Sequence, residues 1–209
     1  QDLRFDNTSN LAMTNNWSGA GTNMWRITFT NGTGSRTIYG STQNTFRNNG
    51  TPKIENYDDE LQTILFPFRL ETTTEINPVN ANLTVGGAID NNGQWINVWG
   101  ANQKTLTIGG VLSGSGGLAV KQDSIVVMTN NNTFSGAIWV EKGTVQLNTH
   151  TNAIGASGIV NVGTNATLDL QYGAVDMRPA TLNLYGTGTN STWGALRKAT
   201  SSATTWQGV

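Results

Sequence analysis

Cysteine is absent from this chain of 209 residues, and proline occurs only 4 times. The fold therefore cannot rely on disulfides, and a chain of this length can bury enough apolar surface to do without them. Charge is also scarce, at 12% of the residues with a net charge of -1, and the longest like-charged run is Asp58-Asp59-Glu60. This composition excludes the basic surface of a nucleic-acid-binding protein and the polybasic segment of a membrane anchor.

Long apolar runs are missing as well, and no stretch of about 18 apolar residues could form a transmembrane helix. The sequence shows no signal peptide and opens with Gln1 rather than Met, which we interpret as a processed or truncated start. The chain is rich in Gly, Asn, Thr and Ser, and it contains 7 Trp, 6 Phe and 4 Tyr. Because disordered chains are poor in aromatic residues, we expect an ordered, turn-rich, all-β protein.

Short segments that alternate apolar, polar and apolar residues dominate the second half of the chain and are typical of β-strands. They fall into two interleaved series. Successive members are 22, 20, 22 and 22 residues apart in the first series and 23, 19, 20 and 23 apart in the second. The first series is Ile96/Val98, Leu118/Val120, Ile138/Val140, Val160/Val162 and Leu182/Leu184; the second is Leu83/Val85, Leu106/Ile108, Ile125/Val127, Val145/Leu147 and Leu168/Leu170.

Two series with a common period of roughly 20–23 residues predict a single-stranded parallel β-helix, in which each strand pairs with the strands one coil above and below. An antiparallel β-sandwich also alternates, but it does not need two series locked to one period over five turns. Leucine-rich repeats share the period, but their Leu/Asn template and helical segments do not occur here. We therefore predict a β-solenoid with stacked Leu, Ile and Val inside and Gly and Asn at the corners.

The domain organisation follows from where this period is visible. We expect a single continuous domain in which residues 81–209 form regular solenoid coils. Residues 1–80 are less regular and are predicted to be irregular N-terminal coils or a cap. The polar, aperiodic stretch at about residues 42–60 is predicted to be an inserted loop.

Residues 82–170 resemble the autotransporter-associated β-strand repeat. The matching motifs are GSGGL at residues 114–118, NTFSG at 132–136, KGTVQL at 142–147 and ATLDL at 166–170, in that order and spacing. The resemblance implies a right-handed parallel β-helix passenger on a bacterial surface or in the extracellular space. It carries no defined catalytic residues. Such passengers are usually longer and often end in a membrane-spanning β-barrel, whose strand pattern does not occur here.

The C-terminal segment repeats motifs of the earlier coils. GALRK at residues 194–198 resembles GGLAVK at 116–121, and TTWQGV at 204–209 resembles NTFSGAI at 132–138. We therefore expect the chain to stop as another strand of the first series begins, leaving an edge that another molecule or further coils complete. The residues assigned to this end-to-end assembly are Thr204, Thr205, Trp206, Gln207, Gly208 and Val209.

Catalytic sites on parallel β-helices need clustered carboxylates on one outward face. Asp58, Asp59 and Glu60 with Glu55 are the obvious candidates. Consecutive strand positions alternate between faces, so a solvated acidic loop is the favoured interpretation. Asp169 lies between two inward leucines and is expected to be outward and isolated. We predict no catalytic residue and no enzymatic activity.

Two further motifs are favoured as structural elements. His150 is the only histidine, lies in a Thr/Asn-rich turn, and cannot by itself build a metal site or a catalytic triad. SGSGG at residues 113–117 lacks the Lys-Ser/Thr of a phosphate-binding loop, so a solenoid corner is expected. No cofactor or metal is predicted.

Trp139 stands apart because its register between two inward residues points it outward. Val126 is also interpreted as an outward apolar residue, and Trp99 lies near the same surface. An outward Trp can stack on a sugar ring or anchor a protein interface. The alternative is that the N-terminal region or a loop covers it.

The leading functional hypothesis is an extracellular or cell-surface structural protein, whose solenoid stacks end to end into a filament or forms part of a longer autotransporter-like passenger. The expected partner is a second copy of the chain. An adhesin that binds a glycan or a host surface protein is the alternative, and a polysaccharide-active enzyme comes third. Neither nucleic acid nor a transmembrane segment is expected.

Overall fold

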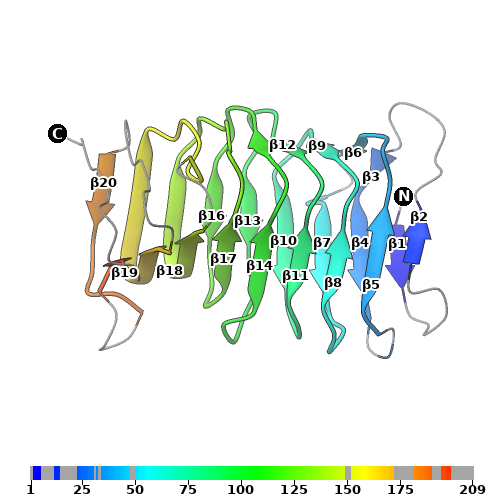
Figure 1. The fold of residues 1–209 in the computed structure, drawn as a ribbon, viewed down its shortest axis with the longest axis horizontal. Coiled ribbons are helices and arrows are strands. Elements are labelled where there is room, and N and C mark those ends of the chain that lie inside the picture. The colour runs from blue at the N-terminus through cyan, green and yellow to red at the C-terminus, as the bar shows by residue number, and fades with distance from the viewer. Residues whose placement is uncertain are drawn as a thin grey trace.

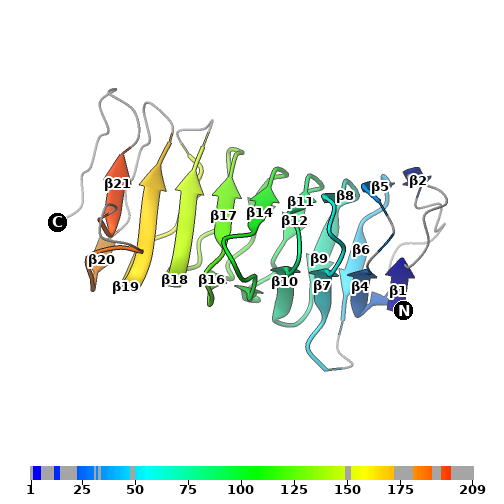
Figure 2. The same ribbon diagram turned by 90° about the horizontal axis from the view of Figure 1, so that it is seen from below.

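The computed structural model contains an elongated stack of parallel β-strands, with β1 and β2 at one end and β20 and β21 at the other (Figures 1 and 2). No helix occurs among the residues that it describes. The predicted all-β parallel solenoid is therefore confirmed. The structure describes residues 2–5, 12–14, 23–30, 32, 34–47, 50–148, 152–171, 181–189 and 194–198.

The first face of the solenoid is a ladder of parallel strands, each paired with its counterparts in the neighbouring coils. In strand segments such as Ile96–Val98 and Ile138–Val140, two buried apolar residues flank a more exposed outward one, which is the pattern of a sheet that covers a core on one side. They are β1 (Asp2–Phe5), β4 (Arg26–Phe29), β7 (Lys53–Asn56), β10 (Thr74–Pro78), β13 (Ile96–Val98), β16 (Leu118–Val120), β18 (Ile138–Leu147), β19 (Ile159–Leu170) and β20 (Thr181–Leu184).

The second face is a matching ladder, joined to the first by two long strands that turn the corner between the faces. β18 pairs with β16 through Ile138–Val140 and with β17 through Thr144–Leu147. Gly143 sits at this corner with a φ of 87°, where a side chain would be strained. The second face comprises β2 (Ala12–Thr14), β5 (Arg36–Tyr39), β8 (Gln62–Ile64), β11 (Leu83–Val85), β14 (Thr105–Ile108), β17 (Ile125–Met128), the later parts of β18 and β19, and β21 (Leu196–Lys198).

A third ladder completes the coil, and the sequence periodicity does not reveal it. Three of its strands are only two residues long, so the ladder shows no continuous alternation from coil to coil. Ile89 pairs with Phe68 on one side and with Leu112 on the other, and all three side chains are buried. The strands of this ladder are β3 (Asn23–Met24), β6 (Asn44–Phe46), β9 (Phe68–Leu70), β12 (Ile89–Asp90) and β15 (Leu112–Ser113).

The core consists of side chains stacked along the solenoid axis. In the first face, the predicted column is present in register, because Ile96 pairs with Leu118 and Leu118 with Ile138. Val160 and Leu182 continue it. The first four of these side chains are fully buried, and Leu182 packs against the same cluster. The prediction of this column is confirmed.

The second column is shifted by one residue from its prediction in a single coil. Leu106 pairs with Val126, and Val126 with Val145, so the inward pair in this strand is Val126/Met128. Ile125 and Val127 are the partly exposed residues instead. The error arose because all four residues of β17 are apolar, so their pattern does not tell which two face the core.

The segment at about residues 42–60 was wrongly expected to be an inserted loop. It contains β6 and β7, and β7 pairs in register with β4 and β10. Phe29 and Asn56 are paired across a coil of 27 residues, from 56 - 29, whereas Ile96 and Leu118 are 22 apart. The longer coil hides the period in the sequence, but it does not interrupt the ladder.

Candidate functional site

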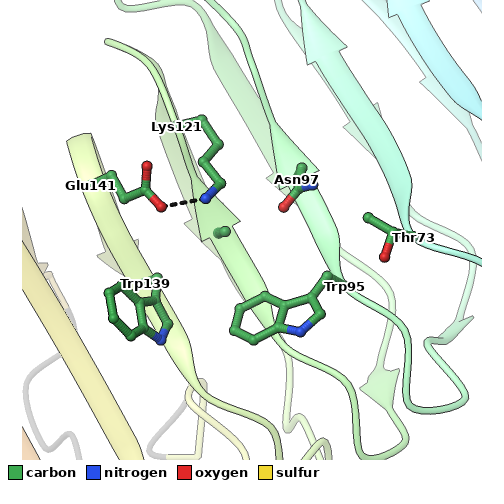
Figure 3. A pocket seen from close by; sticks show the side chains of 7 residues that line it. Thr73, Trp95, Asn97, Lys121, Trp139 and Glu141 are labelled. Atoms are coloured by element: carbon green, nitrogen blue, oxygen red, sulfur yellow. Dashed lines mark hydrogen bonds and ion pairs between the residues drawn. The ribbon is translucent and has the colours of Figure 1, made fainter. Parts of the chain in front are cut away.

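An aromatic groove of about 380 Å³ lies on the outer side of the first face. We call it the Trp95–Trp139 groove. Figure 3 shows the two indole side chains flanking its lower part, with the polar groups above them. The lining residues come from consecutive coils and are Thr73, Trp95, Asn97, Ala119, Lys121, Trp139 and Glu141.

Trp139 is outward, as its alternation with buried Ile138 and Val140 predicts, and 44% of its surface is exposed. It pairs in register with Ala119, which in turn pairs with Asn97. Parallel strands are ~4.8 Å apart, so Trp139 and Asn97 are separated by about two such spacings. The residue between them is an alanine, and its small side chain leaves the floor of the groove low.

Trp95 forms the other wall and was missed by sequence reasoning. It immediately precedes β13, and its half-buried ring leans over Gly117 of the next coil. A Cβ atom on Gly117 would lie 2.5 Å from Cζ3 of Trp95, so only glycine leaves room for the ring there. Gly117 lies one coil (117 - 95 = 22 residues) after Trp95, and this spacing is the signal that the sequence offered.

The upper part of the groove is polar and its charge is compensated. Lys121 Nζ and Glu141 Oε1 form an ion pair between neighbouring coils. The Asn97 amide and the Thr73 hydroxyl supply neutral hydrogen-bonding groups beside it. Two apolar rings and a neutral set of donors and acceptors can therefore contact one ligand together.

The other predicted interaction residues do not share this groove. Trp99 is on the same face and is 42% exposed, but it does not line the groove. Val126 is fully buried, so the prediction that it is a surface residue is wrong, for the reason given by the register of β17. The residues assigned to end-to-end assembly, Thr204, Thr205, Trp206, Gln207, Gly208 and Val209, lie outside the described residues, as does His150.

The acidic residues near position 58 do not converge on one cavity. Glu55 is buried, and its Oε2 accepts a hydrogen bond from Arg26 Nη2 at 2.7 Å. Asp58 is also buried, and its Oδ1 accepts a hydrogen bond from the backbone N–H of Glu60 at 3.0 Å. Asp59 and Glu60 are exposed. The favoured solvated-loop interpretation is thus right for Asp59 and Glu60 and wrong for Glu55 and Asp58.

Asp169 was expected to be outward and isolated on the solvated surface. It does lie opposite Gln146 between two inward leucines, but the expectation that it is solvated and isolated is wrong. Its side chain is fully buried. Its Oδ2 atom accepts hydrogen bonds from Gln146 Nε2 at 3.5 Å and from Gln171 Nε2, and it lies 3.5 Å from Arg197 Nη1. Gln146 and Arg197 come from the neighbouring coils, which the position of Asp169 between two leucines does not reveal.

Tyr57 and Lys53 have shifted pKa values close to Glu55. Partial burial, the charge of Glu55 and a hydrogen bond of 3.2 Å from Tyr57 Oη to Glu55 Oε1 raise the pKa of Tyr57. The hydrogen bond to Glu75 raises the pKa of Lys53 above its ordinary value, against the opposing effect of burial. The Lys53–Glu75 pair joins neighbouring coils of the first face. Tyr57 also lines a second hollow of about 270 Å³.

Other kinds of site are not evident in the part of the chain that the structure describes. No cluster of three or more His, Cys, Asp or Glu side chains is placed to bind a metal ion there. None of those residues belongs to a helix of the length and hydropathy required to cross a membrane. The SGSGG segment at residues 113–117 leads from β15 to β16 with no helix after it.

The comparisons with known proteins leave the chain without an assigned family. No family model matches the sequence, and no curated protein or solved structure matches the chain. The functional argument therefore rests on the residues, their motifs and their arrangement in the solenoid.

Proposed function

We propose that this chain is a structural β-solenoid element of an extracellular or cell-surface protein, built to stack coil upon coil. The observation that carries this proposal is the in-register column from Ile96 to Leu182. Each coil presents the same row of backbone donors and acceptors to the next one. A further coil, from a second copy or from a longer chain, can therefore pair in the same way.

Ion pairs between neighbouring coils support the same role. Lys53 Nζ lies 2.7 Å from Glu75 Oε2, and Arg69 Nη1 lies 3.1 Å from Asp90 Oδ2. Each pair is partly exposed and stabilises the fold little by itself. In each pair, opposite charges of two neighbouring coils balance each other on the outer surface of the solenoid. This balance is compatible with a rod in which the coils repeat.

The surface location is supported by the resemblance of residues 82–170 to the autotransporter-associated β-strand repeat. We infer a non-catalytic role, because buried Glu55 is bound by Arg26 of the neighbouring coil and buried Asp58 by the backbone N–H of Glu60, whereas Asp59 and the Glu60 side chain are exposed. An acid and a base that act on one glycosidic bond must face a common cavity.

The experiment is to measure the mass of the full chain by multi-angle light scattering over a wide concentration range, and to image it by negative-stain electron microscopy. End-to-end stacking predicts a mass that rises with concentration and unbranched rods of constant width. A Trp139→Ala variant, changed only on the side of the solenoid, should assemble as the wild-type chain does. A chain that stays monomeric at high concentration and forms no rods would show that separate copies do not stack.

A further inference from the structure

We propose that the Trp95–Trp139 groove binds a neutral glycan, with a sugar ring seated against the two indoles above Ala119. This inference is independent of the structural role, because the groove lies on the side of the solenoid and not at its ends (Figure 3). It also does not require assembly, since all seven lining residues belong to one chain.

The arrangement of large and small residues is the first argument. Two tryptophans stand in coils on either side of the one that contributes Gly117 and Ala119. Any side chain at Gly117 would collide with Trp95, and a large residue at Ala119 would fill the floor. Beyond Trp139 the same outward row continues with Asn161 and Asn183. The outward row is therefore polar beyond Trp139, and the pair of indoles ends there.

The chemistry of the lining is the second argument. An indole offers a flat apolar surface with a polar N–H at its edge, and the C–H face of a pyranose ring is complementary to it. Sugar hydroxyls donate and accept hydrogen bonds, as do the Asn97 amide and the Thr73 hydroxyl. These groups line the same groove as the indoles.

The charge of the groove selects among ligands. Lys121 and Glu141 neutralise each other, so the groove offers no net charge to a uronate, a sialic acid or a phosphate. An acidic glycan would gain no unpaired cation here and would lie close to the Glu141 carboxylate. Charge complementarity therefore favours a neutral sugar.

The size of the groove separates a glycan from a folded protein partner. A stable protein interface buries about 800 Å² on each side. A volume of about 380 Å³ falls in the range of small-molecule pockets and suits one or two sugar rings. The polar Asn161 and Asn183 beside it do not extend the apolar area that a protein partner would need.

The test begins with an array of neutral oligosaccharides of glucose, galactose, mannose and N-acetylglucosamine, together with sialylated and uronate-containing glycans and proline-rich peptides. The strongest neutral binder is then titrated against the full chain by calorimetry and tryptophan fluorescence. We expect binding to neutral glycans, and Trp139→Ala to weaken it by at least ~10-fold, as truncation of a central aromatic anchor does.

Two further variants keep this test independent of folding. Ala119→Gln puts a longer side chain into the floor of the groove without removing either indole, so it should also weaken binding. Trp99→Ala is the matched control, because Trp99 has nearly the same exposure as Trp139 and lies outside the groove. Each variant must melt as cooperatively as wild type. Unchanged affinity in Trp139→Ala and Ala119→Gln, binding to acidic glycans or peptides alone, or no binding to any neutral glycan would overturn the proposal.

Discussion

The indole ring of Trp95 covers Gly117 of the next coil so closely that a Cβ atom on the glycine would lie 2.5 Å from Cζ3 of the ring. The same Cβ would be 2.7 Å from the backbone oxygen of Ala137. A side chain at Gly117 would therefore collide with the Trp95 ring of the preceding coil and with the backbone of the following coil. The packing of three neighbouring coils depends on the absence of that side chain.

We predict that Gly117→Ala moves the Trp95 ring and destabilises the protein. Overpacking of this kind costs about 1–3 kcal/mol, because backbone as well as the ring must shift. Urea unfolding monitored by tryptophan fluorescence measures the loss. Gly158→Ala is the control, since nothing lies within 4 Å of a Cβ at that position. Equal stability of the two variants would show that Trp95 does not pack on Gly117.

We predict that Leu118→Ala is strongly destabilising. Leu118 is fully buried between Ile96 and Ile138, so the truncation leaves a cavity and costs about 2–5 kcal/mol. Ile159→Ala, which truncates a residue that is 45% exposed, should change the stability by less than about 0.5 kcal/mol. Denaturant midpoints of both variants test this difference, and a reversed order would contradict the stacking of the column.

We predict that Asn132→Leu destabilises the protein at the third ladder through lost hydrogen bonds and not through lost volume. The buried Asn132 Oδ1 accepts a hydrogen bond from Leu112 N at 2.8 Å, and Nδ2 donates one to Ala153 O at 2.6 Å. Each buried group left without a partner costs about 1–3 kcal/mol. The neighbouring Asn131 is exposed, so Asn131→Leu should be nearly neutral. Comparable thermal stability of the two variants would contradict this account.

We predict that Tyr57 contributes to a loss of stability in alkali. Burial and Glu55 raise the pKa of Tyr57 in the folded chain, so the unfolded chain releases the proton first as the pH rises. Its contribution is complete below roughly pH 10, the ordinary tyrosine value, and is lost as the pH rises through the folded pKa. Tyr57→Phe should therefore lose less stability between about pH 9 and 11 than wild type does.

The direct measurement for Tyr57 is tyrosinate absorbance. Subtracting the titration curve of Tyr57→Phe from that of the wild-type chain isolates one hydroxyl. The curve should place its midpoint above the ordinary value. A midpoint at or below that value would mean that Glu55 does not face Tyr57 as the structure has it.

The sequence was sufficient to predict the first column and hence the fold. Strands such as β13 carry one outward polar residue between two inward apolar ones, and a constant coil length repeats that unit. Both conditions must hold for a period to appear. The earlier coils fail the second, since the one that joins Phe29 to Asn56 is longer than the later ones.

Other features of the fold were hidden for physical reasons. The four apolar residues of β17 allow two registers, and only pairing with Leu106 and Val145 selects the one that buries Val126. Three strands of the third ladder have only two residues, so no repeated alternation marks this ladder in the sequence. Its contribution to the core, through residues such as Phe68 and Leu112, depends on where the chain turns and not on a local pattern.

The sequence predicted one wall of the Trp95–Trp139 groove, Trp139, but not the other, Trp95. Trp139 sits inside a strand, so alternation fixed its direction. Trp95 precedes its strand, and its position depends on the missing side chain of Gly117 in another coil. Pairings that cross coils, such as Lys121 with Glu141, cannot be assigned until the register is known.

The most direct test of the account is a series of spin-label distances along one outward row of the second face. Thr37, Thr63 and Thr84 belong to this row, which continues through Thr107 and Val127 to Gln146. The chain has no cysteine, so each label requires only an introduced one.

Labels at Gln146→Cys combined in turn with Thr84→Cys, Thr63→Cys and Thr37→Cys should be three, four and five strand spacings apart. Electron paramagnetic resonance is expected to give backbone separations of ~14, ~19 and ~24 Å, one increment of ~4.8 Å per coil. Distances that fail to increase in this order, or that change by any other increment, would contradict the stacked coils on which both proposals depend.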